Sequence, residues 1–188
     1  MAVSCGWSDD DTSVQRVKTG PRATALGKLH TQDDPSSPHE VAATLASWGQ
    51  GKVGALWFDY GDAYLNRRVS VARDFLEAVV RALFPEPLVE VKGTHQVDVS
   101  VARQEDRLVV HFVNTSGPHE QTQQYVFDDI PAAGPLQVAV RLPEKPRSVT
   151  LEPGRRVQRF GYRDGRLLVT LPPVEIHDLL VIEPARAP

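Results

Sequence analysis

A short segment between residues 57 and 64 carries the side chains best suited to chemistry. Asp59 and Asp62 are flanked there by Trp57, Tyr60 and Tyr64. Hydrolysis of a glycosidic bond needs two carboxyl groups, about 5–5.5 Å apart in a retaining enzyme and about 6.5–9.5 Å apart in an inverting one. Carboxylates also bind sugar hydroxyls, and aromatic faces stack on sugar rings. These five residues are therefore candidates for the border of a sugar site.

An alternative interpretation gives the two aspartates structural roles. Asp59 would end a strand, Gly61 would form the turn, and Asp62 would cap a helix by accepting hydrogen bonds from its first turn. We favour this interpretation, so the sequence predicts no catalytic residue in this chain. Loops that follow buried strands carry function in many α/β architectures, and the border of a sugar site stays as the second hypothesis for this segment.

The start of the same predicted helix carries Asn66, Arg67 and Arg68. Cations at a helix N-terminus oppose the helix dipole, at a cost of a few tenths of a kcal/mol each unless they are paired. The position of the two arginines indicates an interface with an acidic partner, either another domain or a neighbouring subunit. The alternative is that nearby aspartates of this chain neutralise them.

The sequence gives little support to nucleophilic catalysis. Cys5 is the only cysteine, which excludes an intramolecular disulfide, and no glycine-rich serine turn surrounds a nucleophile. Glu175 and His177 have the alternate spacing that places an acid and a base on one side of a strand. We interpret them as an exposed pair on an edge strand.

Metal binding is not predicted either, and no cofactor is expected. The candidate ligands lack the spacing of a compact motif. His111 lies within a predicted strand and is interpreted as a core or interface residue. The long polar loop from residue 116 to 135 lacks the alternating oxygen ligands of a calcium loop. The ligands considered are His95, Asp98, His111, His119, Asp128, Asp129 and His177.

The elements that position these residues begin near Val41. Residues 41–48 and 53–58 are predicted to form a hairpin around the Gly49–Lys52 turn, and the second strand is almost wholly apolar. A helix over 62–84 follows, with apolar residues at three- and four-residue steps, and Pro85 prevents its continuation. Residues 1–40 are predicted to be disordered or irregular because they contain few large apolar residues.

After residue 88 the hydrophobic period changes from about 3.6 to 2. Short alternating segments separated by Gly, Pro, Asn and Asp predict an antiparallel β-sandwich over residues 88–183. Asp164-Gly165 is a strong signal for a hairpin turn. The predicted strands are 88–91, 96–102, 107–114, 136–142, 148–151, 158–162, 166–171 and 176–182. The expected fold class is α+β, with an incomplete α/β unit at 41–84 followed by the sandwich.

Composition excludes several classes of function. The chain has 188 residues and a formal net charge of −3, and its cations are scattered, so no nucleic-acid partner is expected. No apolar run reaches the ~18–20 residues that cross a bilayer. The N-terminus lacks the pattern of a signal peptide. A cytoplasmic location is expected by default.

Several segments together resemble the C-terminal region of putative glycoside hydrolases similar to β-galactosidases and α-L-fucosidases. Residues 49–53 and 64–68 resemble the end of the β-galactosidase trimerisation domain, which has a glutamine-amidotransferase-like fold. Four further segments resemble the β-sandwich that follows this domain in these enzymes: residues 84–91 (FPEPLVEV), 97–101 (VDVSV), 113–119 (VNTSGPH) and 141–146 (RLPEKP). The resemblance implies a catalytic (β/α)₈ barrel elsewhere, since this chain cannot contain one.

The expected function is therefore a non-catalytic accessory or assembly part of a glycoside hydrolase. Its expected partner is a glycoside hydrolase catalytic domain or a neighbouring subunit. The strand at 53–58 is expected to lack neighbours on one side, which favours self-association. One alternative is a free-standing carbohydrate-binding sandwich, and another is a small independent glycosidase that uses Asp59 and Asp62.

Overall fold

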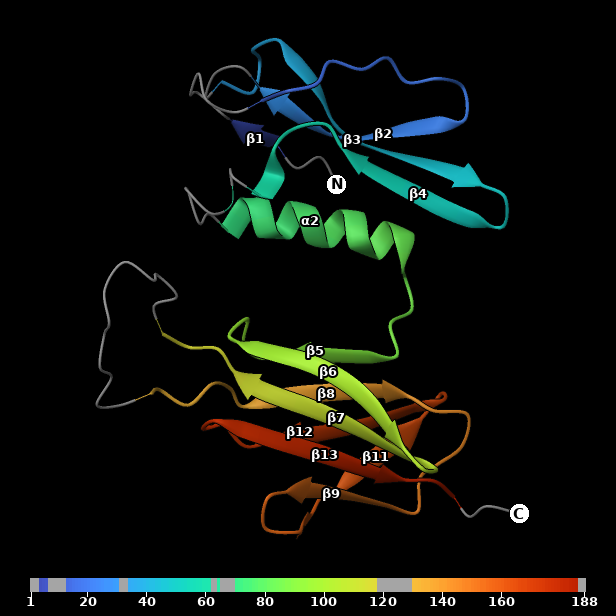
Figure 1. Cartoon of the computed structure of the whole chain (residues 1–188), viewed down its shortest axis with the longest axis vertical. Helices are drawn as coiled ribbons and strands as arrows, with labels where there is room; N and C mark the ends of the chain where they lie inside the picture. Colours follow the sequence, from blue (N-terminus) through green and yellow to red (C-terminus); the bar gives the residue numbers. More distant parts are fainter. Residues whose placement is uncertain are drawn as a thin grey trace. The chain divides into compact units, whose positions relative to one another are not determined.

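The computed structural model describes residues 4–6, 13–30, 34–61, 64, 70–117 and 130–185, the first of these ranges by its backbone only (Figure 1). The chain divides into two compact units, Met1–Glu86 and Pro87–Pro188. The division lies inside the Pro85-Glu86-Pro87 segment.

The first unit contains a four-stranded sheet with the order β1-β2-β3-β4. Its strands are β1 (Ser4–Gly6), β2 (Ala23–His30), β3 (His39–Trp48) and β4 (Gly51–Leu56). β1 runs parallel to β2, and the other pairs are antiparallel. The predicted hairpin is present as β3 and β4, with Gly49 at φ 57° in the turn.

The prediction that residues 1–40 are irregular is wrong for β1 and for the start of β3, and most clearly for residues 23–30. These residues form β2, which pairs with β3 from Ala23↔Ala46 to His30↔His39. The strand was hard to recognise because it combines small and charged side chains, and Gly27 at φ 72° interrupts its alternation. Its order comes from pairing and from burial of Leu29 and His30, not from local propensity.

The helix α2 (Ser70–Leu83) packs on this sheet through Ala72, Phe75 and Val79, which are buried. Gly54 of β4 permits this approach, since a Cβ atom there would lie 2.9 Å from Cδ1 of Leu83. The helix ends just before Pro85, as predicted. The first part of the predicted helix, including the Asp62 cap, lies outside the described residues.

The strand β4 has β3 as its only neighbour in the described part of the sheet. The segment after β4 is flanked on both sides. Trp57 N donates to the carbonyl of Ala42, and Val14 forms an antiparallel bridge with Phe58. The expectation of a strand with one open side therefore holds for Gly51–Leu56 and not for residues 57–59.

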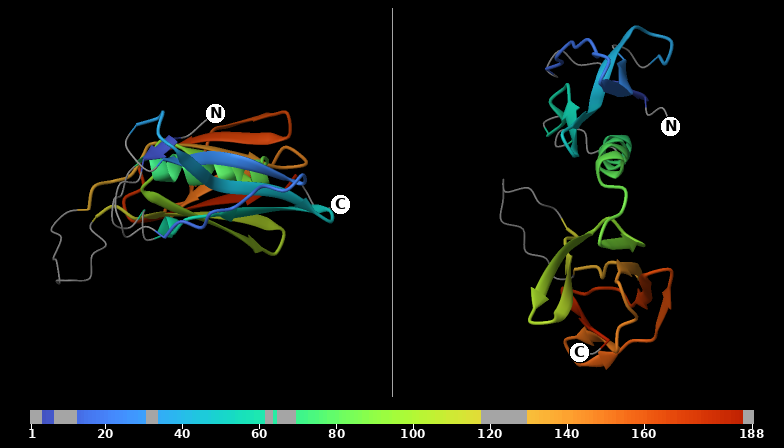
Figure 2. Two further views of the ribbon diagram at one scale, coloured as in Figure 1. Left: turned by 90° about the horizontal axis from the view of Figure 1, so that it is seen from above. Right: turned by 90° about the vertical axis from the view of Figure 1, so that its right-hand side faces the viewer.

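The second unit is an antiparallel β-sandwich, as predicted, with two sheets that face each other (Figure 2). The larger sheet has the order β10-β9-β13-β7-β6, and the smaller has the order β11-β12-β8-β5. The strands are β5 (Val89–Lys92), β6 (Val97–Gln104), β7 (Arg107–Asn114), β8 (Leu136–Arg141), β9 (Ser148–Glu152), β10 (Arg156–Val157), β11 (Phe160–Arg163), β12 (Arg166–Leu171) and β13 (His177–Glu183).

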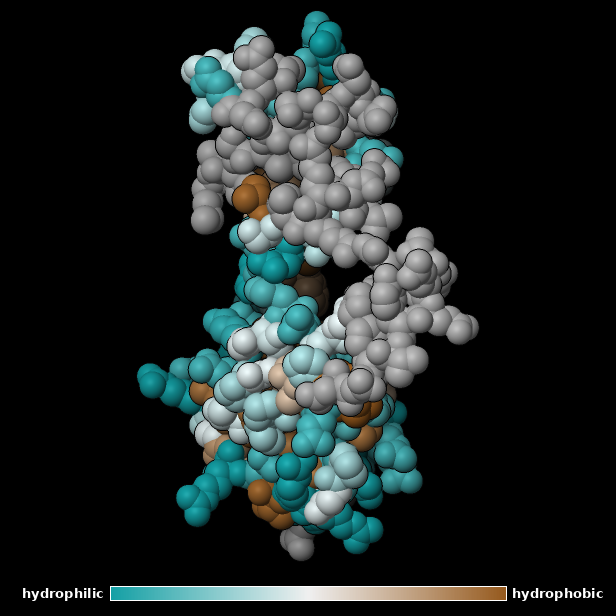
Figure 3. All heavy atoms as spheres, turned by 90° about the vertical axis from the view of Figure 1, so that its left-hand side faces the viewer, coloured by the Kyte–Doolittle hydropathy of each residue, from teal (hydrophilic) through white to brown (hydrophobic). Residues whose placement is uncertain are grey.

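Alternation of side chains builds the sandwich core. In β8, Leu136, Val138 and Val140 are buried, while Gln137 and Arg141 are exposed. Phe112 and Leu180 bring the same alternation from the facing sheet. On the face in Figure 3 the sandwich, at the bottom of the view, is mainly hydrophilic with scattered apolar residues. Within the described ranges, no helix has the length and apolar character needed to cross a membrane.

Candidate functional site

The aromatic residues of the predicted segment fix the local structure of the first unit. Trp57 Nε1 donates to Thr44 Oγ1 at 3.0 Å, and Tyr60 Oη donates to the carbonyl of Ala72 at 3.0 Å. The rings of Tyr60 and Tyr64 are stacked, with centroids 5.9 Å apart and planes 7° apart. Two of these aromatic side chains thus hold the segment against β3 and α2.

Asp59 is exposed at the end of this segment. Its backbone N–H donates to the carbonyl of Ser13 at 3.1 Å. Asp62 lies outside the described residues, and so do Asn66, Arg67 and Arg68. The proposed carboxyl pair and the proposed arginine interface therefore stay predictions.

His111 and His177 lie side by side on β7 and β13. His111 Nδ1 and His177 Nε2 are 3.2 Å apart, and a hydrogen bond links the rings. The prediction that His177 lies on an edge strand is wrong, because β13 is the central strand of the five-stranded sheet. The sequence shows which residues form strands, whereas strand order depends on long-range pairing. His177 is exposed, as predicted, and His111 is half-buried.

The described residues contain no group of three or more His, Cys, Asp or Glu side chains that could hold a metal ion. Of the ligands considered from the sequence, His119, Asp128 and Asp129 lie outside the described residues. The two histidines at 111 and 177 are the ones that the structure brings together.

Among the described residues of the sandwich, Asp178 is the carboxylate that is buried, with 8% of its surface exposed. It is paired in register with Phe112 on the inward side of β13. Desolvation by burial raises the pKa of Asp178, and Arg156, whose guanidinium lies 3.5 Å away, opposes this shift. A raised pKa is typical of catalytic acids. Asp178 does not line the cavity on the outer face of the smaller sheet, so we assign it a structural role.

The raised pKa of Asp178 predicts a pH effect on stability. Between the unfolded value of 3.8 and the higher folded value, the native state binds more protons than the unfolded state. Stability from this group is therefore largest below 3.8 and falls as pH rises through the folded pKa. Relative to Asp178→Asn, we expect the wild type to lose stability in urea unfolding as pH rises from the unfolded value of 3.8 through the folded pKa. A difference in unfolding free energy between wild type and Asp178→Asn that does not change with pH would contradict the raised pKa of Asp178.

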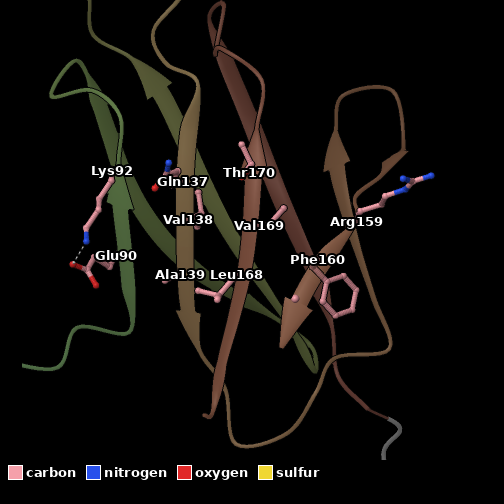
Figure 4. Close-up of a pocket in the computed structure, with 11 residues that line it drawn as sticks. Glu90, Lys92, Gln137, Val138, Ala139, Arg159, Phe160, Leu168, Val169 and Thr170 are labelled. Atoms are coloured by element: carbon pink, nitrogen blue, oxygen red, sulfur yellow. Dashed lines mark ion pairs between the residues drawn. The ribbon is translucent and has the colours of Figure 1, made fainter. Parts of the chain in front are cut away.

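A cavity of about 640 Å³ lies on the outer face of the smaller sheet of the sandwich (Figure 4). We call it the sheet trough. All four strands of this sheet contribute to it, so its shape depends on their register. Its lining residues are Glu90, Lys92, Gln137, Val138, Ala139, Arg159, Phe160, Gly161, Leu168, Val169 and Thr170.

The floor of the sheet trough is a row of small and apolar residues. Ala139 pairs with Leu168, and Leu168 pairs with Gly161 on the next strand. Gly161 leaves the surface open, because the nearest atom to a Cβ placed there would be Cβ of Leu168 at 4.0 Å. A short side chain beside a glycine therefore creates the hollow. Its volume is within the range of about 300–1,000 Å³ typical of small-molecule sites.

Charged and polar side chains border this floor. Glu90 interacts with Lys92 Nζ at 3.7 Å and with Arg166 Nη1 at 3.5 Å. In Figure 4, Glu90 and Lys92 lie on the opposite side of the trough from Arg159 and Phe160. Sequence reasoning missed this site because each residue looks like the exposed position of an ordinary strand. The available signal was Gly161 inside a strand, which indicates a bulge or a close approach.

The comparisons with known proteins find similar chains among solved structures. No family model and no curated protein matches the chain. Among solved structures, α-L-fucosidase isoenzyme 2 from Paenibacillus thiaminolyticus superposes with a TM-score of 0.64 at 18% identity. The match covers 84% of this chain and 24% of the fucosidase chain, so this chain spans about a quarter of that enzyme. The chain therefore has a fold related to part of a glycoside hydrolase.

Proposed function

We propose that this chain is a non-catalytic accessory and assembly part of a glycoside hydrolase. The observation that carries the proposal is the fold match, which includes most of this chain and only 24% of an α-L-fucosidase. The sheet trough supports it, because its lining contains one carboxyl group, Glu90, and two cations hold that group. Glycoside hydrolysis with two carboxyl groups needs a second acid across the bond.

In this proposal each unit has a separate task. The first unit, with its helix at 70–83, is the end of a domain of the β-galactosidase trimerisation type. It contributes the open edge of β4 to an assembly contact with a catalytic domain or a neighbouring subunit. Unpaired strand edges present a row of backbone donors and acceptors to a partner. The sandwich helps to orient the catalytic domain.

The proposal predicts a chain without turnover of its own. Purified protein mixed with 4-nitrophenyl α-L-fucoside or β-galactoside is expected to release no nitrophenol above buffer, because the described part of the chain offers no paired acids in its trough. Asp59→Asn is the control. Turnover by the wild type that disappears in this variant would overturn the accessory role and establish the independent glycosidase.

A second arm of the same experiment tests the assembly contact. Val53 on β4 is 53% exposed, and a lysine on an edge strand opposes strand pairing. In sedimentation velocity, the wild type is expected to self-associate as its concentration rises, and Val53→Lys to reduce this. Val113→Lys, on the interior strand β7 and at a residue 39% exposed, is the matched control. A monomer at every concentration contradicts the assembly part of the proposal.

The sheet trough favours a second function, namely saccharide binding by the sandwich. The trough combines an apolar floor with amide, hydroxyl and charged groups at its border. Such a combination is typical of small-molecule sites. Saccharide binding is compatible with the accessory role, because a non-catalytic sandwich can hold substrate near a catalytic domain. Binding of a glycan array by the full chain tests it.

A further inference from the structure

The outer face of the smaller sheet carries an excess of positive charge. Its register places the outward-facing side chains of each strand in rows across the sheet. The acidic residues on this face and its turn are Glu90 and Asp164. The cations on this face and at the border of the trough are Lys92, Arg141, Arg159, Arg163 and Arg166. This face is thus opposite in sign to the chain, whose formal net charge is −3.

Three of these arginines occupy one row beside the trough. Arg141 on β8 pairs with Arg166 on β12, which pairs with Arg163 on β11. Like charges directly opposite on neighbouring strands destabilise a sheet. Glu90 interacts with the middle arginine, and Asp164 Oδ2 lies 3.1 Å from Nε of Arg163. The row therefore concentrates three guanidinium groups on one face, and the two carboxylates reduce the repulsion between them.

The floor of the trough indicates which kind of saccharide fits. A neutral sugar is commonly held by stacking on the face of an aromatic ring. Ala139, Leu168 and Gly161 offer no such face, and Phe160 packs against the core of the sandwich. The remaining means of recognition are charge and hydrogen bonding. Arginine suits this task because its planar guanidinium binds a carboxylate or sulfate through two parallel hydrogen bonds.

We propose that the sheet trough binds an acidic saccharide, with a sugar ring over Ala139, Leu168 and Gly161. The carboxylate or sulfate of the ligand binds Arg166 and Lys92, and its hydroxyls bind Gln137 and Thr170. Glu90 holds the two cations in the free protein and competes with the ligand for them. This inference rests on the second proposed function, saccharide binding by the sandwich, and names the class of saccharide.

Calorimetric titration of the full chain tests the proposal with three ligands: tri-galacturonate, a chondroitin sulfate tetrasaccharide and neutral galacto-oligosaccharides. We expect an acidic ligand to bind and the neutral ones not to bind. The affinity is expected to fall as salt is added, because salt screens exposed charges. Tri-galacturonate carries carboxylates alone, whereas the chondroitin sulfate tetrasaccharide carries carboxylates and sulfates. Binding of both ligands would indicate recognition of a carboxylate, and binding of the sulfated ligand alone would indicate recognition of a sulfate.

Four variants locate the site. Arg166→Gln is expected to lower the affinity about tenfold, because one charge-assisted contact is lost. Glu90→Gln is expected to raise it, because the competing carboxylate is removed. Gly161→Val, which suits a strand and has no atom nearer than 4.0 Å to its Cβ, is expected to abolish binding by filling the trough. Arg147→Gln is the charge-matched control, because Arg147 pairs with Glu183 in the other sheet.

The outcomes separate this inference from the function on which it rests. Equal losses in Arg166→Gln and Arg147→Gln would show non-specific attraction and overturn the site. Binding of neutral saccharides that Gly161→Val abolishes would keep saccharide binding and overturn the acidic class. Absence of binding to all saccharides tested would overturn both the acidic class and saccharide binding by the sandwich. The accessory role is tested separately, by the turnover and sedimentation measurements.

Discussion

Replacing Phe112 with alanine is expected to lower the free energy of unfolding of the sandwich by about 3–5 kcal/mol. Phe112 has no exposed surface, and it lies in the core among residues of both sheets. Its loss removes the transfer free energy of the ring and leaves a cavity that the surrounding strands fill only in part. A small domain has about 5–15 kcal/mol of stability, so this loss is a large fraction of it.

The measurement must report on the sandwich alone, because the chain has two units and global unfolding need not be two-state. Amide hydrogen exchange of β7 and β13 meets this need. Val113→Ala is the matched control, since Val113 follows Phe112 in the same strand, points to the opposite face and is 39% exposed. A loss below about 1 kcal/mol for Phe112→Ala would contradict the assigned core, because surface substitutions give changes of that size.

The sandwich could be predicted from the sequence because its signals are local. Alternation of apolar and polar residues marks β8 and β12, and burial follows it residue by residue. Asp164 and Gly165 have φ of 52° and 71°, the values that a two-residue hairpin turn needs. Each of these features depends on neighbours along the chain, so a single sequence reveals them.

The errors concern features that depend on distant pairing. β2 was missed because its two leucines, Leu26 and Leu29, are three residues apart and break the alternation of a strand, and because its order depends on β3. The position of β13 in the middle of its sheet follows from pairing with β7 and β9. Neither pairing leaves a local pattern that a single sequence could show.

The candidate site shows the same limit. The segment with Trp57 and Tyr60 was a candidate site because aromatic and acidic residues are close together there in sequence. In the structure, both of these side chains donate hydrogen bonds to other residues of the first unit. The residues that line the sheet trough are close together only in the folded structure. Ala139 and Gly161 are distant in sequence and share a row because of the register of β8, β12 and β11. A hollow formed in this way has no sequence motif.

Substitution of Gly93 by alanine is expected to destabilise the sandwich by about 2–5 kcal/mol, from backbone strain and overlap together. Gly93 has φ of 119°, a conformation that residues with a Cβ rarely adopt. A Cβ atom at this position would overlap the backbone carbonyl oxygen of Pro135, so one of the two backbone segments must move. Backbone yields less readily than the end of a flexible side chain.

The same substitution is expected to disturb the sheet trough, because Gly93 directly follows Lys92 and Pro135 precedes β8. Displacement of either segment shifts the register partners Lys92 and Gln137. Gly161→Ala is the control, since its new Cβ meets no atom within 4.0 Å and its φ is not positive. Hydrogen exchange in β5 and β8 should rise strongly for Gly93→Ala and remain near wild type for Gly161→Ala. Equal protection in both variants would contradict the prediction. It would show that the turn after β5 accepts a side chain and that the close contact with Pro135 does not fix the position of Lys92.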